Sequence, residues 1–419
     1  MRGGTTGHGA APAAEAATDA ARPTVPGPRA GDGTRPRTAD TPALRPTAAP
    51  PGRPRVLLAP VTVTPSKPLT PSHLKGLLWT DVMYRATAHV ADVTLRYSHT
   101  TYHPTEQTLG FWEFLDRHHP DLDPSTLDEL ELGALYVAFR SAGERVPAAA
   151  LRPYADAVEH GWTHPAAARV LDIWTAQYAE LGLHDPGLRA HQPPGLSTEA
   201  MIDRLGTLGM CLDQRPLGGP VLLDLTRHGV PLRTLIAPDG RPNYLACALR
   251  ELLALAPEHD EVVLLYDSQL DPDYQRLARV VAALGPAVSR VPIGRVPIDG
   301  AIRSAREGGW RDHHAGTLLA ATRSGHDPRA VRLGLRLYFI AVLGPGQAES
   351  FRPDLLHQCL GRAARLLAAA RDDGQPPLAE QLTRHRRTRL HIDPYRLTTS
   401  LLGRHRRTPA TDLLTGVFL

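Results

Sequence analysis

A strand, a turn and a helix follow one another near the start of the chain, and this order constrains the fold more than any other feature. The apolar, β-rich run Val56–Val63 is typical of a buried strand, and Leu74–Ala88 has helical periodicity. A second strand is predicted at Asp92–Tyr97. Strand, helix and strand in this order form a βαβ unit, which requires a parallel sheet with a right-handed crossover. The sequence therefore predicts an α/β fold.

Further segments extend this pattern. Strands are predicted at Pro220–Leu225, Leu232–Ala237 and Glu261–Tyr266, and helices at Tyr244–Leu255 and Tyr274–Leu284. The Pro/Gly-rich stretch Val291–Gly300 is expected to be irregular. Helical patterns dominate elsewhere. We expect a Rossmann-like domain at residues 55–313, with a helical insertion at about 106–200, and a helical, basic C-terminal domain at 314–419.

Composition limits the classes to which the chain can belong. Residues 1–54 consist mainly of Ala, Pro, Thr, Gly and Arg, and such a segment cannot bury enough surface to offset its ordering entropy, so we expect a disordered arm. The sequence contains no apolar run of about 18 residues and no apolar signal-peptide core, so we expect a cytoplasmic protein without a membrane span. Cys211, Cys247 and Cys359 lack CxxC spacing and are expected to be reduced thiols. No metal site is predicted from the histidines.

The two lysines of the chain, Lys67 and Lys75, flank the turn between the first strand and its helix. All other residues among the 47 Lys and Arg are arginine, and the turn itself is rich in proline and hydroxyl groups. A helix N-terminus surrounded by cations and hydroxyls suits a phosphate, and open parallel sheets bind ligands at the carboxyl ends of their strands. The alternative is an ordinary βα turn with two surface lysines.

Basic residues also gather near the C-terminus. Residues 381–419 contain eight arginines and two aspartates, a local charge of 8 − 2 = +6, in a chain with a formal net charge of +4. The string Arg-His-Arg-Arg-Thr occurs twice there. Such clusters suit a nucleic-acid backbone, and a solvated basic tail is the alternative. The candidate RNA-binding residues are Arg384, Arg386, Arg387, Arg404, Arg406 and Arg407.

Short motifs are spread in a fixed order over residues 55–310. They are Thr64-Pro65-Ser66-Lys67-Pro68-Leu69-Thr70-Pro71-Ser72-His73, Thr105–Gly110, Trp174–Leu183, Asp239–Leu245, Leu264–Gln269 and Ser304–Gly308. In this order they resemble the motifs of class I aminoacyl-tRNA synthetases, closest to the arginyl-tRNA synthetase family. The first corresponds to that family's Ser-Pro-Asn, Lys-Pro-Leu and His-x-Gly-His, and the last to its second signature. The resemblance implies a divergent, truncated paralogue with a Rossmann-type parallel sheet, a helical insertion and a helical C-terminal domain.

The resemblance also implies a reaction. In the family, the carboxylate of an amino acid attacks the α-phosphorus of ATP, and the protein stabilises the charge on the phosphates and aligns the reactants. The expected substrate complex is ATP with Mg²⁺, without a tightly bound cofactor. Carried over by position, the catalytic residues would be His73, Thr70, Lys67 and Lys75, and the ATP-binding residues Ser72, Arg303, Ser304 and Arg306.

The amino-acid site departs from the family pattern. The residues implied there are Ser66, Tyr244, Asp267 and Gln269. The family holds the guanidinium of arginine with a Tyr, an Asp four residues later and a Gln on the next strand. Tyr244 and Gln269 match, but Ala248 stands at the Asp position, and Asp267 is a candidate to compensate. A buried cation without a counter-charge is costly, so arginine is a doubtful substrate. Thr70 and Ser72 also replace the first His and the Gly of the first signature.

Two functions are compatible with these residues. One is a ligase that activates an amino acid with ATP and transfers it to tRNA or another acceptor, with specialised metabolism as a candidate setting. The other is a catalytically degenerate paralogue that binds RNA or a partner protein, which the departures from the signatures and the basic tail favour. An unrelated nucleotide-binding α/β protein is a third, weaker alternative. The expected partners are ATP, an amino acid and tRNA or another acceptor, with a monomeric protein.

Overall fold

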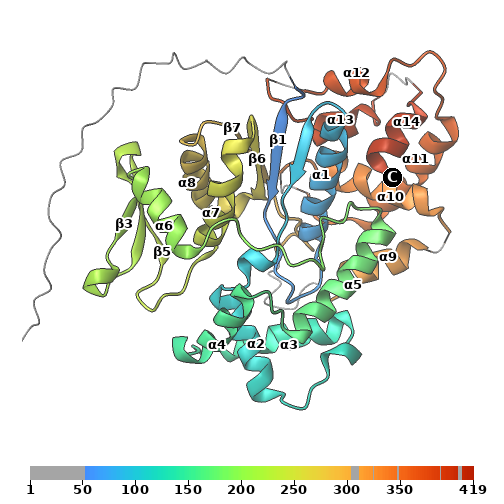
Figure 1. The fold of residues 1–419 in the computed structure, drawn as a ribbon. Coiled ribbons are helices and arrows are strands. Elements are labelled where there is room, and N and C mark those ends of the chain that lie inside the picture. Colours follow the sequence, from blue (N-terminus) through green and yellow to red (C-terminus); the bar gives the residue numbers. More distant parts are fainter. Residues whose placement is uncertain (1–51, 303–310, 324, 347–348, 387, 404–407) are drawn as a thin grey trace, which may run out of the picture. The chain divides into compact units, whose positions relative to one another are not determined.

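The computed structural model describes residues 52–302, 311–323, 325–346, 349–386, 388–403 and 408–419. The predicted disordered arm lies almost entirely outside these residues, and so do Arg303, Ser304, Arg306, Arg387 and residues 404–407. From Gly52 onward the described residues belong to one unit by their contacts (Figure 1).

A parallel sheet with strand order β2–β1–β6–β7 organises this unit (Figure 1). Strand β1 pairs in parallel with β2 and β6, and β6 pairs in parallel with β7. The βαβ unit and the parallel sheet predicted from the sequence are confirmed. The strands are β1 (Arg55–Pro60), β2 (Asp92–Leu95), β6 (Glu261–Asp267) and β7 (Ala287–Ile293).

Apolar cores cover both faces of the sheet. Val56 and Leu58 of β1 belong to one core together with helix α1 (Pro71–Ala88), whereas Leu57 and Ala59 belong to a second core. The second core contains helices α7 (Tyr244–Leu255) and α8 (Asp271–Ala282). Successive side chains of a strand point to opposite faces, so a strand buried on both sides needs the continuous apolar run seen in the sequence.

The strand β7 was not predicted, because Pro292 and Gly294 near its end are typical of irregular segments and not of strands. It nevertheless pairs with β6 along its whole length. Proline is tolerated there because β7 is the last strand of the described sheet and Pro292 needs to donate no further ladder hydrogen bond. The predicted irregular stretch Val291–Gly300 therefore begins inside a strand.

A separate antiparallel sheet lies in the insertion between β2 and α7. Its strand order is β3–β4–β5. Two of its strands were predicted, and the short β3 was not. The strands are β3 (Cys211–Asp213), β4 (Val221–Leu225) and β5 (Val230–Ile236).

The other regular elements of the described residues are helices, in agreement with the predicted helical patterns. The helices of the insertion are α2 (Glu106–His118), α3 (Glu129–Ala142), α4 (Ala148–Glu159), α5 (Pro165–Leu181) and α6 (Thr198–Thr207). Those after β7 are α9 (Ala315–Arg323), α10 (Pro328–Arg336), α11 (Pro353–Ala369), α12 (Leu378–Thr383), α13 (Pro394–Ser400) and α14 (Thr411–Leu413). Short π-helical segments follow α10 and α14, at Leu337–Val342 and Leu414–Phe418.

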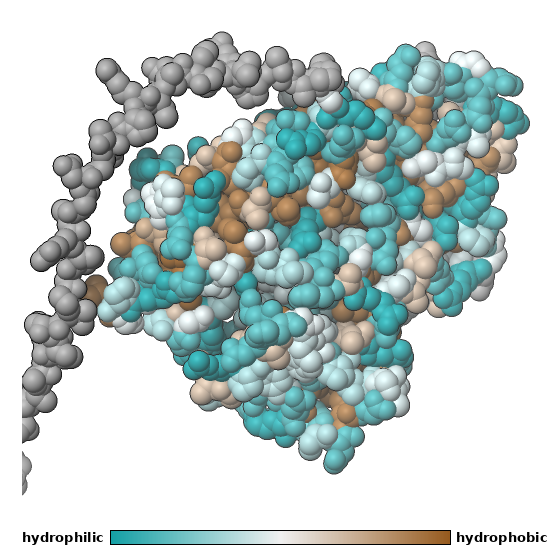
Figure 2. All heavy atoms as spheres, in the orientation of Figure 1, coloured by the Kyte–Doolittle hydropathy of each residue, from teal (hydrophilic) through white to brown (hydrophobic). Residues whose placement is uncertain are grey.

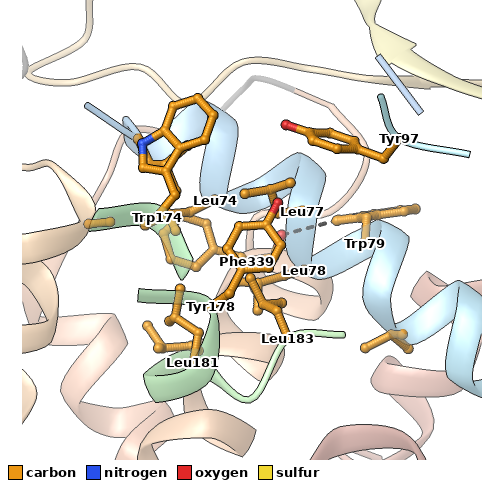
Figure 3. Close-up of a cluster of buried hydrophobic side chains, with 14 of the residues drawn as sticks. Leu74, Leu77, Leu78, Trp79, Tyr97, Trp174, Tyr178, Leu181, Leu183 and Phe339 are labelled. Carbon is orange, nitrogen blue, oxygen red and sulfur yellow. Dashed lines mark hydrogen bonds between the residues drawn. The ribbon is translucent and has the colours of Figure 1, made fainter. Parts of the chain in front are cut away.

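The insertion and the C-terminal helices pack on α1 in a single core. Figure 3 shows Leu78 of α1 near Tyr178 of the insertion and Phe339 of the C-terminal segment. The indole nitrogen of Trp79 donates a hydrogen bond to the Phe339 carbonyl oxygen at 3.4 Å. Helix α1 is thus held from both segments, which fixes the position of its N-terminus.

Polar side chains predominate on the face shown in Figure 2, with apolar ones interspersed among them. Among the helices of the described ranges, none combines the length and the apolar character that a membrane span requires.

Candidate functional site

A cleft of about 620 Å³ opens at the carboxyl ends of β1, β6 and β7. Its walls are the turn after β1, the first turns of α1, the start of α7 and the segments that follow β6 and β7. Open parallel sheets bind their ligands at this position. The cleft is therefore the candidate functional site.

The structure brings seven of the sequence-predicted residues to this cleft. They are Lys67, Thr70, Ser72, His73, Tyr244, Asp267 and Gln269. The predicted ATP-binding residues Arg303, Ser304 and Arg306 lie outside the described residues. Ser66 is buried behind the cleft wall, and its hydroxyl has no hydrogen-bond partner among the described residues.

Lys75 does not reach the cleft, which corrects the expectation that both lysines face a phosphate. Ser72, His73 and Gly76 line the cleft from one side of α1, and Lys75 points from another side. Its side chain is 1% exposed, and its Nζ donates to the carbonyl oxygen of Gly346 at 2.6 Å. Burial lowers the pKa of Lys75 to about 8. Lys75 is a buried link between α1 and the segment before α11.

Thr70 and His73 together shape the N-terminus of α1. Thr70 is the N-cap residue and Pro71 occupies the first helical position, where its fixed φ suits a helix start. The backbone N–H of Thr70 donates to Nδ1 of His73 at 3.1 Å, and the Thr70 hydroxyl lies 3.2 Å from the same nitrogen. Because Nδ1 accepts the backbone N–H, we assign the proton of the neutral ring to Nε2.

The His73 ring is neutral in this structure. Burial of its ring, and after it the nearby charges of Lys67 and Arg295, lower its pKa to about 3. The imidazole therefore stays uncharged at neutral pH, and its Nε2–H can donate to an anion without adding a charge. The positive charge of this end of the cleft comes from Lys67 and Arg295.

Arg295 is a cleft residue that the sequence analysis did not single out. It follows β7, and its side chain is 32% exposed. Its Nε donates to Oδ2 of Asp267 in a short ion pair, while its two terminal nitrogens have no hydrogen-bond partner among the described residues. The only signal for it was an arginine directly after Gly294 at the end of an unrecognised strand. Asp267 thus orients a guanidinium whose outer donors remain available.

Ser72 links the α1 wall of the cleft to the segment after β7 by a hydrogen bond. Its hydroxyl accepts the backbone N–H of Val296 at 3.0 Å, and the neighbouring Gly294 N–H donates to the Pro345 carbonyl at 2.7 Å. The segment after β7 is therefore attached both to α1 and to the C-terminal helices. That Ser72 binds ATP remains a prediction.

The wall formed by α7 carries little charge. Tyr244, the first residue of α7, is 41% exposed toward the cleft, and burial around its hydroxyl raises the pKa of Tyr244 to about 12. Tyr102 stacks on it with 5.9 Å between the ring centroids. Ala248, one turn along α7, also lines the cleft. Leu277 and Tyr274 of α8 continue this largely uncharged surface.

The cleft contains two carboxylates among its described lining residues, and both are ion-paired. Asp267 bonds Arg295, as described above, and its Oδ1 accepts the backbone N–H of Gln269 at 3.0 Å. Asp273 lies 2.9 Å from Arg233 and 3.3 Å from Arg276. Groups of three or more potential metal-ligating side chains are absent from the described part of the chain.

The two predicted RNA-binding arginines that the structure describes, Arg384 and Arg386, are not part of the cleft lining. Arg384 forms an exposed ion pair with Glu380 at 3.0 Å. Arg386 donates to the Val90 carbonyl at 3.1 Å, and partial burial lowers its pKa. The other four, Arg387, Arg404, Arg406 and Arg407, are outside the described residues. The role in RNA binding stays a prediction.

Similarity to known proteins exists at the level of structure. No protein-family model and no curated protein matches the sequence. The chain is similar to arginyl-tRNA synthetase from Thermus thermophilus, with a TM-score of 0.56, 15% identity and coverage of 89% of this chain and 81% of that one. Arginyl-tRNA synthetase from Plasmodium falciparum matches with a TM-score of 0.47 and 11% identity over 76% of this chain and 58% of that one. The likeness to the Thermus structure confirms the predicted class I synthetase-like fold.

Proposed function

We propose that this protein is a class I synthetase-like ligase, which activates an amino acid with ATP and passes it to tRNA or another acceptor. One observation carries the proposal. A helix N-terminus, a neutral histidine donor and two cations, Lys67 and Arg295, meet in one cleft at the carboxyl edge of a parallel sheet. This combination suits the phosphates of a nucleotide.

The proposed chemistry needs little covalent work from the protein. The carboxylate of the amino acid attacks the α-phosphorus of ATP, a new P–O bond forms, and pyrophosphate leaves with the electron pair of the broken P–O bond. Negative charge on the phosphates is stabilised by Nε2–H of His73, the positive end of the α1 helix dipole and the cations Lys67 and Arg295. Mg²⁺ enters with the triphosphate, and the cleft aligns the reactants.

The test is ATP–pyrophosphate exchange with a panel of amino acids. Exchange that depends on one amino acid is expected, together with loss of exchange in His73→Ala. A matched control is His228→Ala, which removes an exposed histidine remote from the cleft lining. Absence of exchange with every amino acid contradicts the proposal.

A second candidate function is a degenerate paralogue that binds RNA or a partner protein. Two placements favour it: Ala248 leaves the α7 wall without a carboxylate, and Lys75 lies outside the cleft. In that case we expect no ATP binding, and salt-dependent tRNA binding that deletion of residues 381–419 abolishes. ATP binding that His73→Ala weakens contradicts this second candidate.

A further inference from the structure

The two carboxylates in the described lining of the cleft, Asp267 and Asp273, are already bonded to arginines of the chain itself, and this limits which amino acid the cleft can hold. We infer that the site takes an amino acid whose side chain carries no positive charge, because Arg295 occupies Asp267 in place of a substrate guanidinium. The inference rests on the proposed amino-acid activation, and it names the class of substrate.

Both oxygens of Asp267 already accept hydrogen bonds from the chain, and its negative charge is balanced by Arg295. Its Oδ2 accepts from Nε of Arg295, and its Oδ1 accepts the backbone N–H of Gln269. The Asp267 side chain is 20% exposed, so the pair is partly shielded from solvent. Arg295 is also tethered to the same chain, and its effective concentration at Asp267 exceeds that of any free guanidinium compound at millimolar levels or below.

The second carboxylate offers no replacement. Asp273 is shared between Arg233 and Arg276, one from β5 and one from its own helix α8. A cationic substrate would have to displace one of these arginines or remain without a counter-charge. An unpaired cation in a partly buried site loses about tenfold to a hundredfold in affinity.

The wall formed by α7 and α8 favours substrate side chains without positive charge. Tyr244, Ala248, Leu277 and Tyr274 present rings and aliphatic groups, with Gln269 as a neutral polar group at the edge. Pockets of this kind hold a ligand by apolar contact and a few oriented hydrogen bonds. The net positive charge of Lys67 further disfavours a second cation in the same cleft.

A gain-of-function variant tests the inference independently of catalysis. Arg295→Met keeps a long side chain but frees Asp267, so binding of L-arginine, measured by isothermal titration calorimetry, is expected to strengthen at least about tenfold over the wild type. Arg295→Met/Asp267→Asn is expected to lose this gain. The matched control is Arg290→Met, which removes an arginine of β7 that bonds Asp271 outside the cleft lining, and it is expected to leave arginine binding as weak as in the wild type.

The outcomes separate this inference from the proposed function. The wild type is expected to catalyse exchange with an uncharged or acidic amino acid and not with arginine or lysine. This result supports the inference and the proposed function together. Exchange with arginine or lysine overturns the inference and leaves the proposed function standing. If no amino acid supports exchange, the proposed function fails, and the titrations alone decide whether Arg295 excludes a guanidinium.

Three titration results overturn the inference: arginine binding to the wild type as tight as to Arg295→Met, an equal gain in Arg290→Met, or no gain in a folded Arg295→Met. If Arg295→Met does not fold, Asp267→Asn replaces it as the deciding variant. The wild type and Asp267→Asn are then expected to bind arginine equally weakly, and tighter binding by the wild type shows that Asp267 does serve a substrate cation.

Discussion

Two aspartate–arginine clusters of this protein use the same chemical groups for different purposes. Between α1, the end of α5 and α10, Asp81 bonds Arg336 at 2.6 Å and Arg85 at 2.9 Å, and it also accepts the backbone N–H of His184 at 2.8 Å. In the cleft, Asp267 bonds Arg295. The two clusters differ in burial and in how completely their donors are used.

Asp81 and Arg336 are closed to solvent, and of their polar side-chain atoms only Nε of Arg336 has no hydrogen-bond partner among the described residues. The Arg336 side chain is 0% exposed and that of Asp81 is 3% exposed. Arg336 also donates to the carbonyl oxygens of Leu181 and Gly182 at 3.1 and 3.0 Å. Burial lowers the pKa of Arg336, and the charge of Asp81 opposes that effect. The two terminal nitrogens of Arg295, by contrast, have no hydrogen-bond partner among the described residues and lie beside the cleft. The buried Asp81–Arg336 pair therefore joins distant segments of the chain, whereas the partly exposed Arg295 is placed where a ligand in the cleft can contact it.

The largest effect is expected from breaking the buried cluster. Asp81→Asn removes the counter-charge of Arg336, and loss of one partner of a buried ion pair costs about 3–5 kcal/mol. Asp267→Asn removes one partner of a partly exposed ion pair and is expected to cost at most about 1 kcal/mol. Urea denaturation followed by circular dichroism measures both free energies of unfolding. Equal losses in the two variants would contradict the contrast between the clusters.

The next effect concerns catalysis at the cleft. His73→Ala removes one donor to the phosphates, and loss of one such donor lowers rates by about 100-fold to 1000-fold. It also removes the acceptor for the Thr70 N–H and is expected to cost about 1 kcal/mol of stability. The measurement is ATP–pyrophosphate exchange at a temperature where both proteins are folded. Unchanged exchange would remove His73 from the mechanism.

A smaller effect separates the two lysines by pH. Burial lowers the pKa of Lys75 in the folded state to about 8, below the ordinary lysine value of 10.5, so the unfolded state binds more protons between these pH values. Stability attributable to Lys75 therefore rises as the pH increases from 8 toward 10.5, by an amount on the order of 2 kcal/mol. Lys75→Met is expected to lose this rise, and Lys67→Met to keep it. Denaturation at several pH values in the two variants measures the difference, and a rise retained in Lys75→Met would refute the assignment.

The smallest effect is expected at the basic C-terminal segment. Arg384 pairs with Glu380 at the surface, so Arg384→Ala should change the free energy of unfolding by less than about 0.5 kcal/mol. If the segment binds RNA, the same variant should reduce the dependence of log K on log salt by about one. Filter binding of tRNA at several salt concentrations measures this slope. A slope identical to that of the wild type would place Arg384 outside any RNA contact.

The periodicity of apolar residues within single segments was sufficient to predict much of the fold. Helix α7 has the predicted bounds, Tyr244–Leu255, because its apolar periodicity and the N-cap Asn243 lie within one segment. Strands β1, β2 and β6 were found for the same reason. Strand β7 was missed because its pairing with β6, and not its own composition, makes it a strand.

The site was predictable to the extent that it follows from the sheet. Parallel strands end at one edge, so motifs that follow different strands were expected to converge, and seven of the named residues do. Lys75 failed that expectation because a helix turns by about 100° per residue, and two positions after His73 the side chain points elsewhere. Arg295 was missed because no residue near it in the sequence indicates that Asp267 is its ion-pair partner.

The amino-acid order alone specified the class of the fold, the edge at which a ligand would bind and most of the side chains gathered there, since these depend on short-range periodicity and on strand direction. Which charges neutralise one another was settled by packing. Asp81 meets Arg336 across 255 positions and Asp267 meets Arg295 across 28, and such partners are chosen by the way helices and strands stack, which brings distant groups within a few ångströms.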